Sequence, residues 1–143
     1  MSLECNNKKK KVLIIDGQGG GIGRQLTLAL KQLEADIEIT AVGTNALATS
    51  NMLKAGADNG ATGENAVIVG CRKADIIVGP IGIAVADSLF GEVTPKMALA
   101  VGQSNAVRVL IPVNHCDNMI AGVGDIPMAK LVENAVELVC RNI

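Results

Sequence analysis

The 143-residue sequence predicts a single-domain α/β fold, a three-layer sandwich with a mostly parallel sheet of four to five strands. Short apolar runs alternate with helical patterns along the chain, as parallel strands joined by crossover helices do. Three of these runs are nearly continuous in Val, Ile and Leu, which is typical of strands buried on both faces of a parallel sheet. Because no Pro-rich linker divides the chain, we expect one domain over residues 12–143 after a flexible lead over residues 1–11.

The elements follow from these patterns in order. Strands are predicted at VLIID, IEITAV, DIIVG and VRVLIPV, over residues 12–16, 37–42, 75–79 and 107–113, with a fifth short strand over 119–123. Helices are predicted over residues 22–33, 44–57, 64–74, 83–89, 95–102 and 127–141. Thr94 and Pro95 are a typical N-cap and first helical residue. Residues 60–63 are predicted as a turn, and the AVIV segment that follows is compatible with a helix or a strand.

Composition excludes several classes of function. An apolar fraction of 49% excludes a disordered chain, and a net charge of −1 gives no electrostatic basis for binding nucleic acid. The longest apolar stretch, residues 76–86, is interrupted by glycine and proline and is too short to span a membrane. The four cysteines form no C-x-x-C pair and the chain has one histidine, so no metal site is predicted. We therefore expect a cytoplasmic protein with reduced thiols.

The clearest functional motif is DGQGGGIG, which directly follows the first predicted strand and opens a helix. Its residues are Asp16, Gly17, Gln18, Gly19, Gly20, Gly21, Ile22 and Gly23. The glycine spacing resembles the G-x-x-x-G-I-G turn of short-chain dehydrogenases. Glycines let backbone N–H groups approach a phosphate at the positive end of a helix. The motif predicts a loop that binds a small anionic ligand, such as the phosphate of a nucleotide of the NAD(P) type.

Three observations limit the dinucleotide interpretation. An acidic residue that holds the adenosine ribose is expected about 20 residues after the last glycine, but Gly43, Thr44 and Asn45 stand there. The Asp16 carboxylate would repel a pyrophosphate unless it braces the loop by accepting N–H bonds or holds Mg²⁺. Short-chain dehydrogenases also use a Tyr-x-x-x-Lys pair, and the chain has no tyrosine. Their catalysis is therefore excluded.

The other strand ends carry small and polar residues. Gly43, Thr44 and Asn45 follow the second strand, and Pro80, Ile81 and Gly82 follow the third. Because the carboxyl ends of parallel strands share one edge of the sheet, we expect these residues near the glycine loop. Helix capping by Asn45 and close packing at Gly82 are the structural alternatives. Neighbouring residues of an extended segment point to opposite sides, which disfavours His115 and Cys116 as a nucleophile pair.

Taken in order, the segments DGQGGGIG, GTNALATSNMLKAGA, GATGENAV and GPIGI resemble a family of small uncharacterised bacterial proteins, a domain-of-unknown-function family typical of Firmicutes. The resemblance runs from about Lys11 to the last helix. It implies a Rossmann-like protein of the bacterial cytoplasm, and it brings no activity, substrate or catalytic residue with it.

The residues support three hypotheses. The first is a sensor or regulator that binds a nucleotide or phosphorylated metabolite through the Gly17–Gly23 loop. The second is a small metabolite enzyme that uses Asp16 and polar strand-end residues. The third is a non-catalytic interaction module in which the glycine turns only solve packing. Ala-rich helices and the high apolar fraction predict a homo-oligomer, a dimer or larger, under all three.

Overall fold

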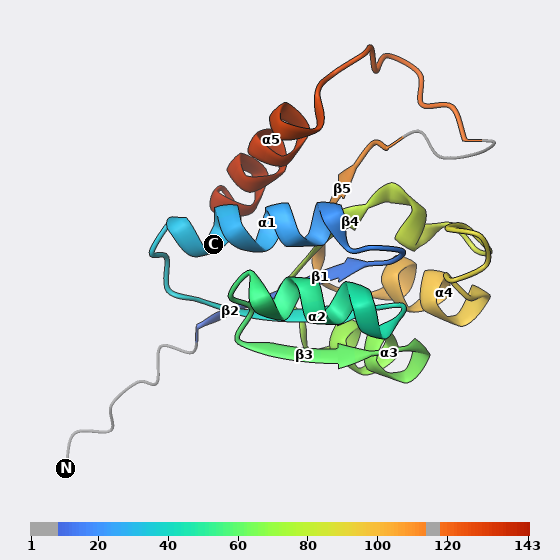
Figure 1. The fold of residues 1–143 in the computed structure, drawn as a ribbon, viewed down its shortest axis with the longest axis horizontal. Coiled ribbons are helices and arrows are strands. Elements are labelled where there is room, and N and C mark those ends of the chain that lie inside the picture. Colours follow the sequence, from blue (N-terminus) through green and yellow to red (C-terminus); the bar gives the residue numbers. More distant parts are fainter. Residues whose placement is uncertain (1–8, 114–117) are drawn as a thin grey trace.

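Five parallel strands form one sheet in the computed structural model, which describes residues 9–113 and 118–143. The strand order is β3-β2-β1-β4-β5. The strands are β1 (Lys10–Asp16), β2 (Ile37–Gly43), β3 (Asn59–Thr62), β4 (Ile76–Pro80) and β5 (Val107–Ile111). The helices are α1 (Gly21–Gln32), α2 (Ala46–Lys54), α3 (Glu64–Lys73), α4 (Pro95–Gln103) and α5 (Met128–Cys140), with a short 3-10 helix η1 (Ile81–Ala84). This confirms the predicted three-layer α/β fold (Figure 1).

The strand predictions were right for four strands and wrong for the fifth. Residues 119–123 form no strand, and the fifth strand is β3, where a turn was predicted. β3 pairs with β2 in parallel, from Thr40 with Asn59 to Gly43 with Thr62. All four β3 residues are exposed at the sheet edge, so the segment lacks the apolar pattern that reveals a buried strand. β1 begins at Lys10 and thus includes the last two residues of the expected lead.

Five of the six predicted helices are present. α3 is helical over its whole length, which settles the AVIV alternative. Thr94 caps α4 as predicted, because its hydroxyl accepts a bond of 3.1 Å from the Met97 N–H. The helix predicted over 83–89 is wrong, since only η1 forms there and turns follow it. Asp87, Leu89 and Phe90 have φ values of 65°, 55° and 56°, which no right-handed helix allows.

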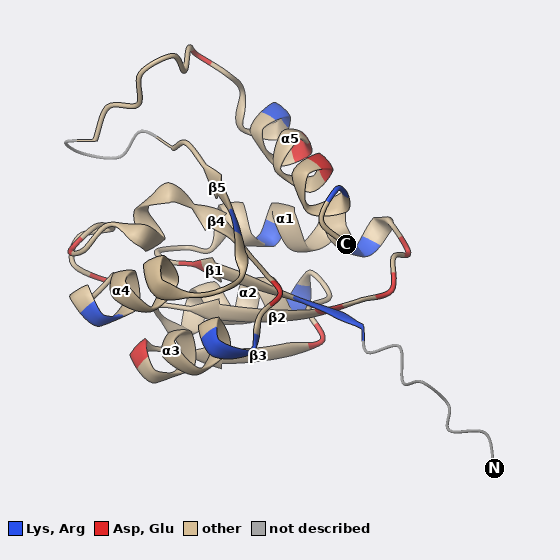
Figure 2. Cartoon of the chain, turned by 180° about the vertical axis from the view of Figure 1, so that it is seen from behind, with Lys and Arg blue, Asp and Glu red and all other residues tan. Residues whose placement is uncertain are grey.

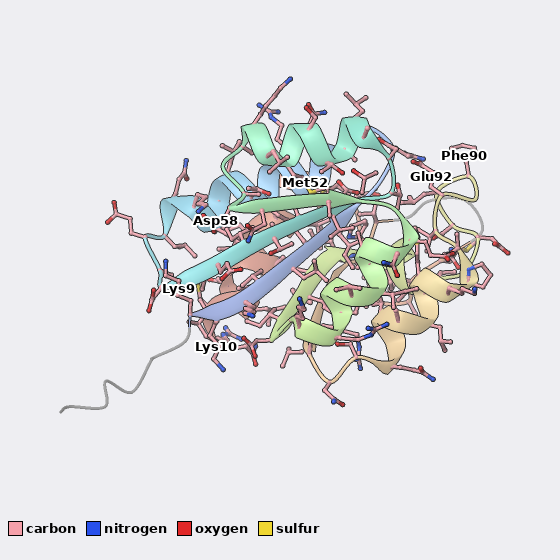
Figure 3. All side chains as sticks on the ribbon, turned by 90° about the horizontal axis from the view of Figure 1, so that it is seen from below. Lys9, Lys10, Met52, Asp58, Phe90 and Glu92 are labelled. Atoms are coloured by element: carbon pink, nitrogen blue, oxygen red, sulfur yellow. The ribbon has the colours of Figure 1, made fainter. Side chains whose placement is uncertain are left out.

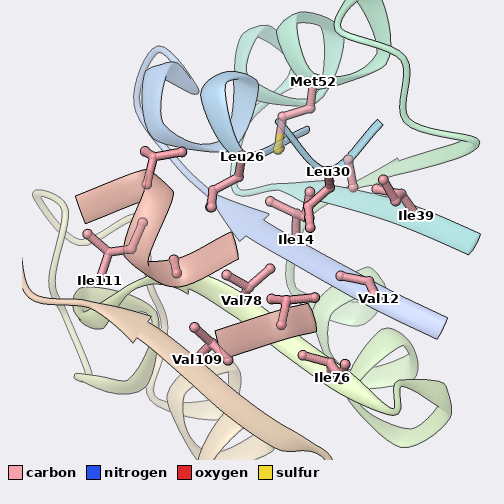
Figure 4. Packing of buried hydrophobic residues seen from close by; sticks show 14 of the residues in the cluster. Val12, Ile14, Leu26, Leu30, Ile39, Met52, Ile76, Val78, Val109 and Ile111 are labelled. Atoms are coloured by element: carbon pink, nitrogen blue, oxygen red, sulfur yellow. The ribbon is translucent and has the colours of Figure 1, made fainter. Parts of the chain in front are cut away.

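Two apolar clusters hold the layers together. Side chains from α1, α2 and α5 pack on one face of the sheet, where Leu26, Leu30 and Met52 meet Val12, Ile14 and Ile39 (Figure 4). The other face is covered by α3 and α4. Thus β1 and β4 are buried on both faces, as their continuous apolar sequences predicted. Within the part of the chain that the structure describes, no helix is long and apolar enough to cross a membrane.

Candidate functional site

The glycine loop lies where the chain reverses its direction across the sheet. From β1 the chain proceeds to β2 and β3 on one side, and it then returns to β4 on the other side of β1. In open α/β sheets, ligands bind at the carboxyl ends of the strands that flank such a switch point. A pocket of about 320 Å³ opens there, between the glycine loop and the ends of β4 and β5. It is lined by residues 16–22 and by Gln25, Pro80, Leu89, Val113 and Met128.

Three glycines of the loop leave no room for a Cβ, and on Gly17 it would lie 2.5 Å from the Thr44 hydroxyl and 2.8 Å from Leu89. Gly20 precedes α1 with φ of 71°, and a Cβ on it would lie 2.8 Å from the Ala48 Cα. A Cβ on Gly23 would overlap the Met52 side chain and lie 3.0 Å from the Asp16 Cβ. Gly20 and Gly23 let α1 and α2 approach the end of β1. Gly19 and Gly21 differ from them, because a Cβ on either would point into open space.

In the glycine loop, the carbonyl groups are hydrogen-bonded within the protein, whereas several N–H groups are not. The carbonyls of Gly17, Gln18 and Gly19 accept bonds from the Gly20 N–H (2.9 Å), the Asn45 side chain (2.8 Å) and the Asn51 side chain (2.7 Å). Among the described residues, none accepts a hydrogen bond from the N–H groups of Gly19, Gly21 or Ile22. The carbonyls of Gln18 and Gly19 are thus held by side chains of α2 and its N-cap, while three unpaired N–H donors remain beside the pocket, as an anion site requires.

Asp16 ends β1 and is only 4% exposed. Its two carboxylate oxygens accept the N–H groups of Gly17 at 2.8 Å and Gly23 at 2.7 Å. The carboxylate therefore braces both ends of the loop and lies against the positive end of α1. This is the loop-bracing role that the sequence left as one alternative.

A carboxylate that the sequence did not single out lies on the opposite flank of the loop. Glu92 accepts the Gln18 N–H (3.1 Å to Oε2), the Thr44 hydroxyl (3.0 Å to Oε1) and the Asn45 amide (2.5 Å to Oε1). It comes from the strap, as we call residues 85–93, which follow η1. Figure 3 shows Glu92 close to Phe90 at the edge of the molecule away from Lys9 and Lys10. Nothing in the local sequence connects Glu92 with a loop 74 positions earlier.

The other predicted site residues differ in their distance from the pocket. Pro80 lines the pocket, whereas Ile81 and Gly82 do not. Thr44 and Asn45 lie beside Glu92, and the Asn45 side chain also caps α2 by accepting the Ala48 N–H at 2.9 Å. Gly43 donates its N–H to the Thr49 hydroxyl at 3.1 Å, beneath α2 and away from the pocket. His115 and Cys116 lie outside the described residues.

The far wall of the pocket is apolar. It is formed by Ile22, Pro80, Leu89, Val113 and Met128, of which only Ile22 and Pro80 were expected at the site from their place after a strand. Leu89 reaches the site from the strap, Val113 follows β5, and Met128 begins α5. The general rule that ligands bind near strand ends identifies residues such as Val113, but no local signal brings the strap there. The site thus joins polar N–H donors on one side to an aliphatic surface on the other.

Charge is distributed unevenly along β1. Lysines stand at its amino end and Asp16 at its carboxyl end (Figure 2). Among the described residues, no Lys or Arg lines the pocket. Any positive potential at the loop therefore comes from backbone N–H groups and the α1 terminus. Over the same residues, no group of three or more His, Cys, Asp or Glu side chains is placed to hold a metal ion.

Another cavity, of about 460 Å³, lies between α3 and α4, beside the amino ends of β4 and β5 and thus away from the glycine loop. Cys71 is in its wall, and burial raises the pKa of the Cys71 thiol to about 11. The thiol is therefore protonated at neutral pH and behaves as a small hydrophobic side chain rather than as a nucleophile. The wall of this cavity also carries the polar residues Arg72, Lys96, Gln103, Ser104 and Asn105, and the Ser104 hydroxyl donates to the Cys71 carbonyl at 2.7 Å.

Comparisons with known proteins add the following. A family model described as "Domain of unknown function (DUF3842)" matches residues 11–143. The comparison with curated proteins gave no match. Among solved structures, the chain is similar to a dodecameric FMN-dependent Ubix-like decarboxylase from Escherichia coli O157:H7. The identity is 17% and the TM-score 0.43, and the match covers 91% of this chain and 75% of that one.

Proposed function

We propose that this chain, which belongs to the DUF3842 family, binds a nucleotide or a phosphorylated metabolite through its Gly17–Gly23 loop and acts as a sensor or regulator. The observation that carries the proposal is the set of unpaired N–H groups on Gly19, Gly21 and Ile22 at the switch point of the sheet. In this arrangement the N–H groups bind the phosphate, and the start of α1 adds favourable potential.

The remainder of the ligand would occupy the apolar wall. A pocket of about 320 Å³ is at the small end of the range for ligand sites, and it suits a ring or a sugar rather than a large substrate. Phe90 is the protein's one aromatic residue, and it is 89% exposed at the tip of the strap. A base in the pocket would therefore lie against aliphatic side chains such as Ile22 and Pro80.

A binding role is favoured over catalysis by the state of the titratable groups. Asp16 is the one described acid or base in the pocket wall, and its two oxygens already hold backbone N–H groups. A general base needs a lone pair directed at the substrate. We further propose that the protein acts in the bacterial cytoplasm, the compartment that its sequence resemblance implies.

The test is the substitution Gly21→Val. Its side chain would project into the open space beside the free N–H groups, where the phosphate is proposed to lie. We expect affinity for inorganic pyrophosphate, AMP and NAD⁺, measured by titration calorimetry, to fall at least about tenfold for each probe that the wild type binds. Thermal stability should change little, because the new side chain meets no neighbour.

Gly102→Val is the matched control. A Cβ on Gly102 also points into open space, but Gly102 belongs to α4, which covers the opposite face of the sheet from α1. Wild-type affinity in the Gly21→Val variant, or a wild type that binds none of the three probes, contradicts the proposal. Because the chain lacks Trp and Tyr, a co-purified base would dominate the ultraviolet spectrum of the purified protein.

The same proposal includes a homo-oligomer, a dimer or larger. Large apolar side chains are exposed on separate elements, including Leu47 on α2 (61%) and Leu99 on α4 (56%). A second copy would cover such residues. Light scattering should therefore give at least twice the monomer mass, and a monomeric mass at micromolar concentration contradicts this part of the proposal.

A further inference from the structure

The position of Glu92 extends the site beyond the pocket. In dinucleotide-binding sheets, an acidic residue at the end of the second strand accepts the 2′-hydroxyl of the adenosine ribose. In this chain, β2 ends in Gly43 followed by Thr44 and Asn45, which supply no acid. The structure places the Glu92 carboxylate beside these residues, within hydrogen-bond distance of Thr44 and Asn45 and of the loop residue Gln18.

We propose that Glu92 supplies the ribose-binding acid from the strap, and that the ligand is an adenine dinucleotide with an unmodified 2′-hydroxyl, of the NAD⁺ class. This inference rests on the proposed function of the glycine loop. The adenosine would lie on the β2 side beside Glu92, the pyrophosphate on the loop N–H groups, and the second half in the pocket beside β4 and β5. The ligand thereby spans both sides of the switch point, as dinucleotides do in such sheets.

The bonds of Glu92 leave it able to accept a hydroxyl. A carboxylate has about four acceptor positions. Oε1 accepts Thr44 and Asn45, and the Gln18 N–H is shared between Oε2 at 3.1 Å and Oε1 at 3.3 Å. Oε2 therefore retains an acceptor position for a sugar hydroxyl, and Glu92 is only partly buried, so a ligand can reach it.

The strap fixes this carboxylate firmly. Leu89 and Val93 are 5% and 1% exposed and anchor the strap on both sides of its tip. The Ser88 hydroxyl lies within hydrogen-bond distance of the carbonyls of Gly82 and Val85 and donates its one proton to either, and the Asp87 N–H donates to the Val93 carbonyl at 2.8 Å. Three non-glycine residues here have positive φ, a costly conformation that persists only when its surroundings impose it. Such support is what a binding group needs to keep its geometry.

Charge defines which nucleotides the site accepts. The Glu92 carboxylate attracts a hydroxyl but repels a 2′-phosphate. Among the described residues, its side-chain donors are Thr44 and Asn45, which are neutral and leave its negative charge uncompensated. No arginine stands at the β2 end to neutralise such a phosphate. We therefore expect NAD⁺ to bind and NADP⁺ to bind at least about tenfold more weakly.

The experiment measures NAD⁺, NADP⁺ and inorganic pyrophosphate on the wild type and on Glu92→Gln by titration calorimetry. Loss of the charged acceptor should weaken NAD⁺ binding about tenfold, and the preference for NAD⁺ over NADP⁺ should shrink because the repulsion is gone. Pyrophosphate, which has no ribose, should lose none of its affinity. Glu133→Gln on the exposed face of α5 is the matched control and should change none of the three affinities.

Two other outcomes would overturn the role of Glu92. If Glu92→Gln strengthens pyrophosphate and NAD⁺ binding, Glu92 occupies an anion position that the ligand must take over, and the inference is overturned. If the wild type binds NAD⁺ and NADP⁺ equally, or binds pyrophosphate and neither dinucleotide, the inference fails while the proposed function of the loop survives. If Glu92→Gln does not fold, Glu92→Asp keeps the charge but withdraws it by one methylene, and it should also weaken NAD⁺ without affecting pyrophosphate.

Discussion

Gly79→Ala should lower the free energy of unfolding by about 3 kcal/mol or more, at the upper end of what overpacking a buried site costs. Gly79 lies in β4, and a Cβ built on it would overlap the carbonyl oxygen of Ile15 in the neighbouring strand β1 and come within 3.1 Å of Ile83. A carbonyl in a paired strand cannot rotate away as a side chain can. The two central strands would therefore have to separate at the edge of the sheet that bears the site.

Urea denaturation measures this loss, with Gly102→Ala as its control. Gly102 lies in α4 with open space around it, so alanine there should leave stability unchanged or raise it by about 0.5–1 kcal/mol. A Gly79→Ala protein within about 0.5 kcal/mol of the wild type would show that β1 and β4 separate easily. The close approach of this glycine to β1 would then be of no energetic importance.

For Asp16→Ala we expect the second large loss, again about 3 kcal/mol, which corresponds to about 10 °C in Tm for a chain of this size. The substitution leaves the N–H groups of Gly17 and Gly23 without their charged acceptor in a buried place. It also removes a negative charge from the positive end of α1. Because the carboxylate braces both ends of the loop, affinity for pyrophosphate should fall together with stability.

Asp16→Asn separates the two causes. The asparagine side chain can accept one N–H, but its amide turns a donor toward the other, so we expect a loss of stability between those of the wild type and Asp16→Ala. Thermal unfolding checks this order. Pyrophosphate titrations with and without Mg²⁺ check the alternative role, since affinity that Asp16→Asn loses only in the presence of Mg²⁺ would mean that Asp16 holds the ion. Equal stability of all three proteins would contradict the bracing role.

The buried parts of the fold could be predicted from the sequence because burial leaves a pattern. The runs that became β1, β2, β4 and β5 are rich in Val, Ile and Leu, and the Thr94 cap identified the start of α4. The edge strand β3 could not be predicted in this way, because NGAT is exposed and is a strand only through its pairing with β2. A helix was predicted over 83–89, but only η1 forms there, and the bonds of Ser88 and Val93 hold the strap that follows in tight turns.

The sequence predicted those parts of the candidate site that lie next to a strand end. The glycine loop, Asp16 and Pro80 meet at the pocket as expected, because each directly follows or ends a strand. Leu89 and Glu92 could not be predicted, since their place depends on how the strap folds back over Gly17 and Gln18. Gly43 was expected to face the ligand, but it packs under Thr49 instead.

The origin of the Glu92 carboxylate affects how such proteins are recognised. Searches for dinucleotide-binding chains look for an acid about 20 residues beyond the glycine loop, and a chain in which a distant strap supplies that acid, as we propose for Glu92, is passed over by that rule. Sequences with the glycine loop and no acid after the second strand would therefore be better screened by the spatial distance from the loop to any carboxylate.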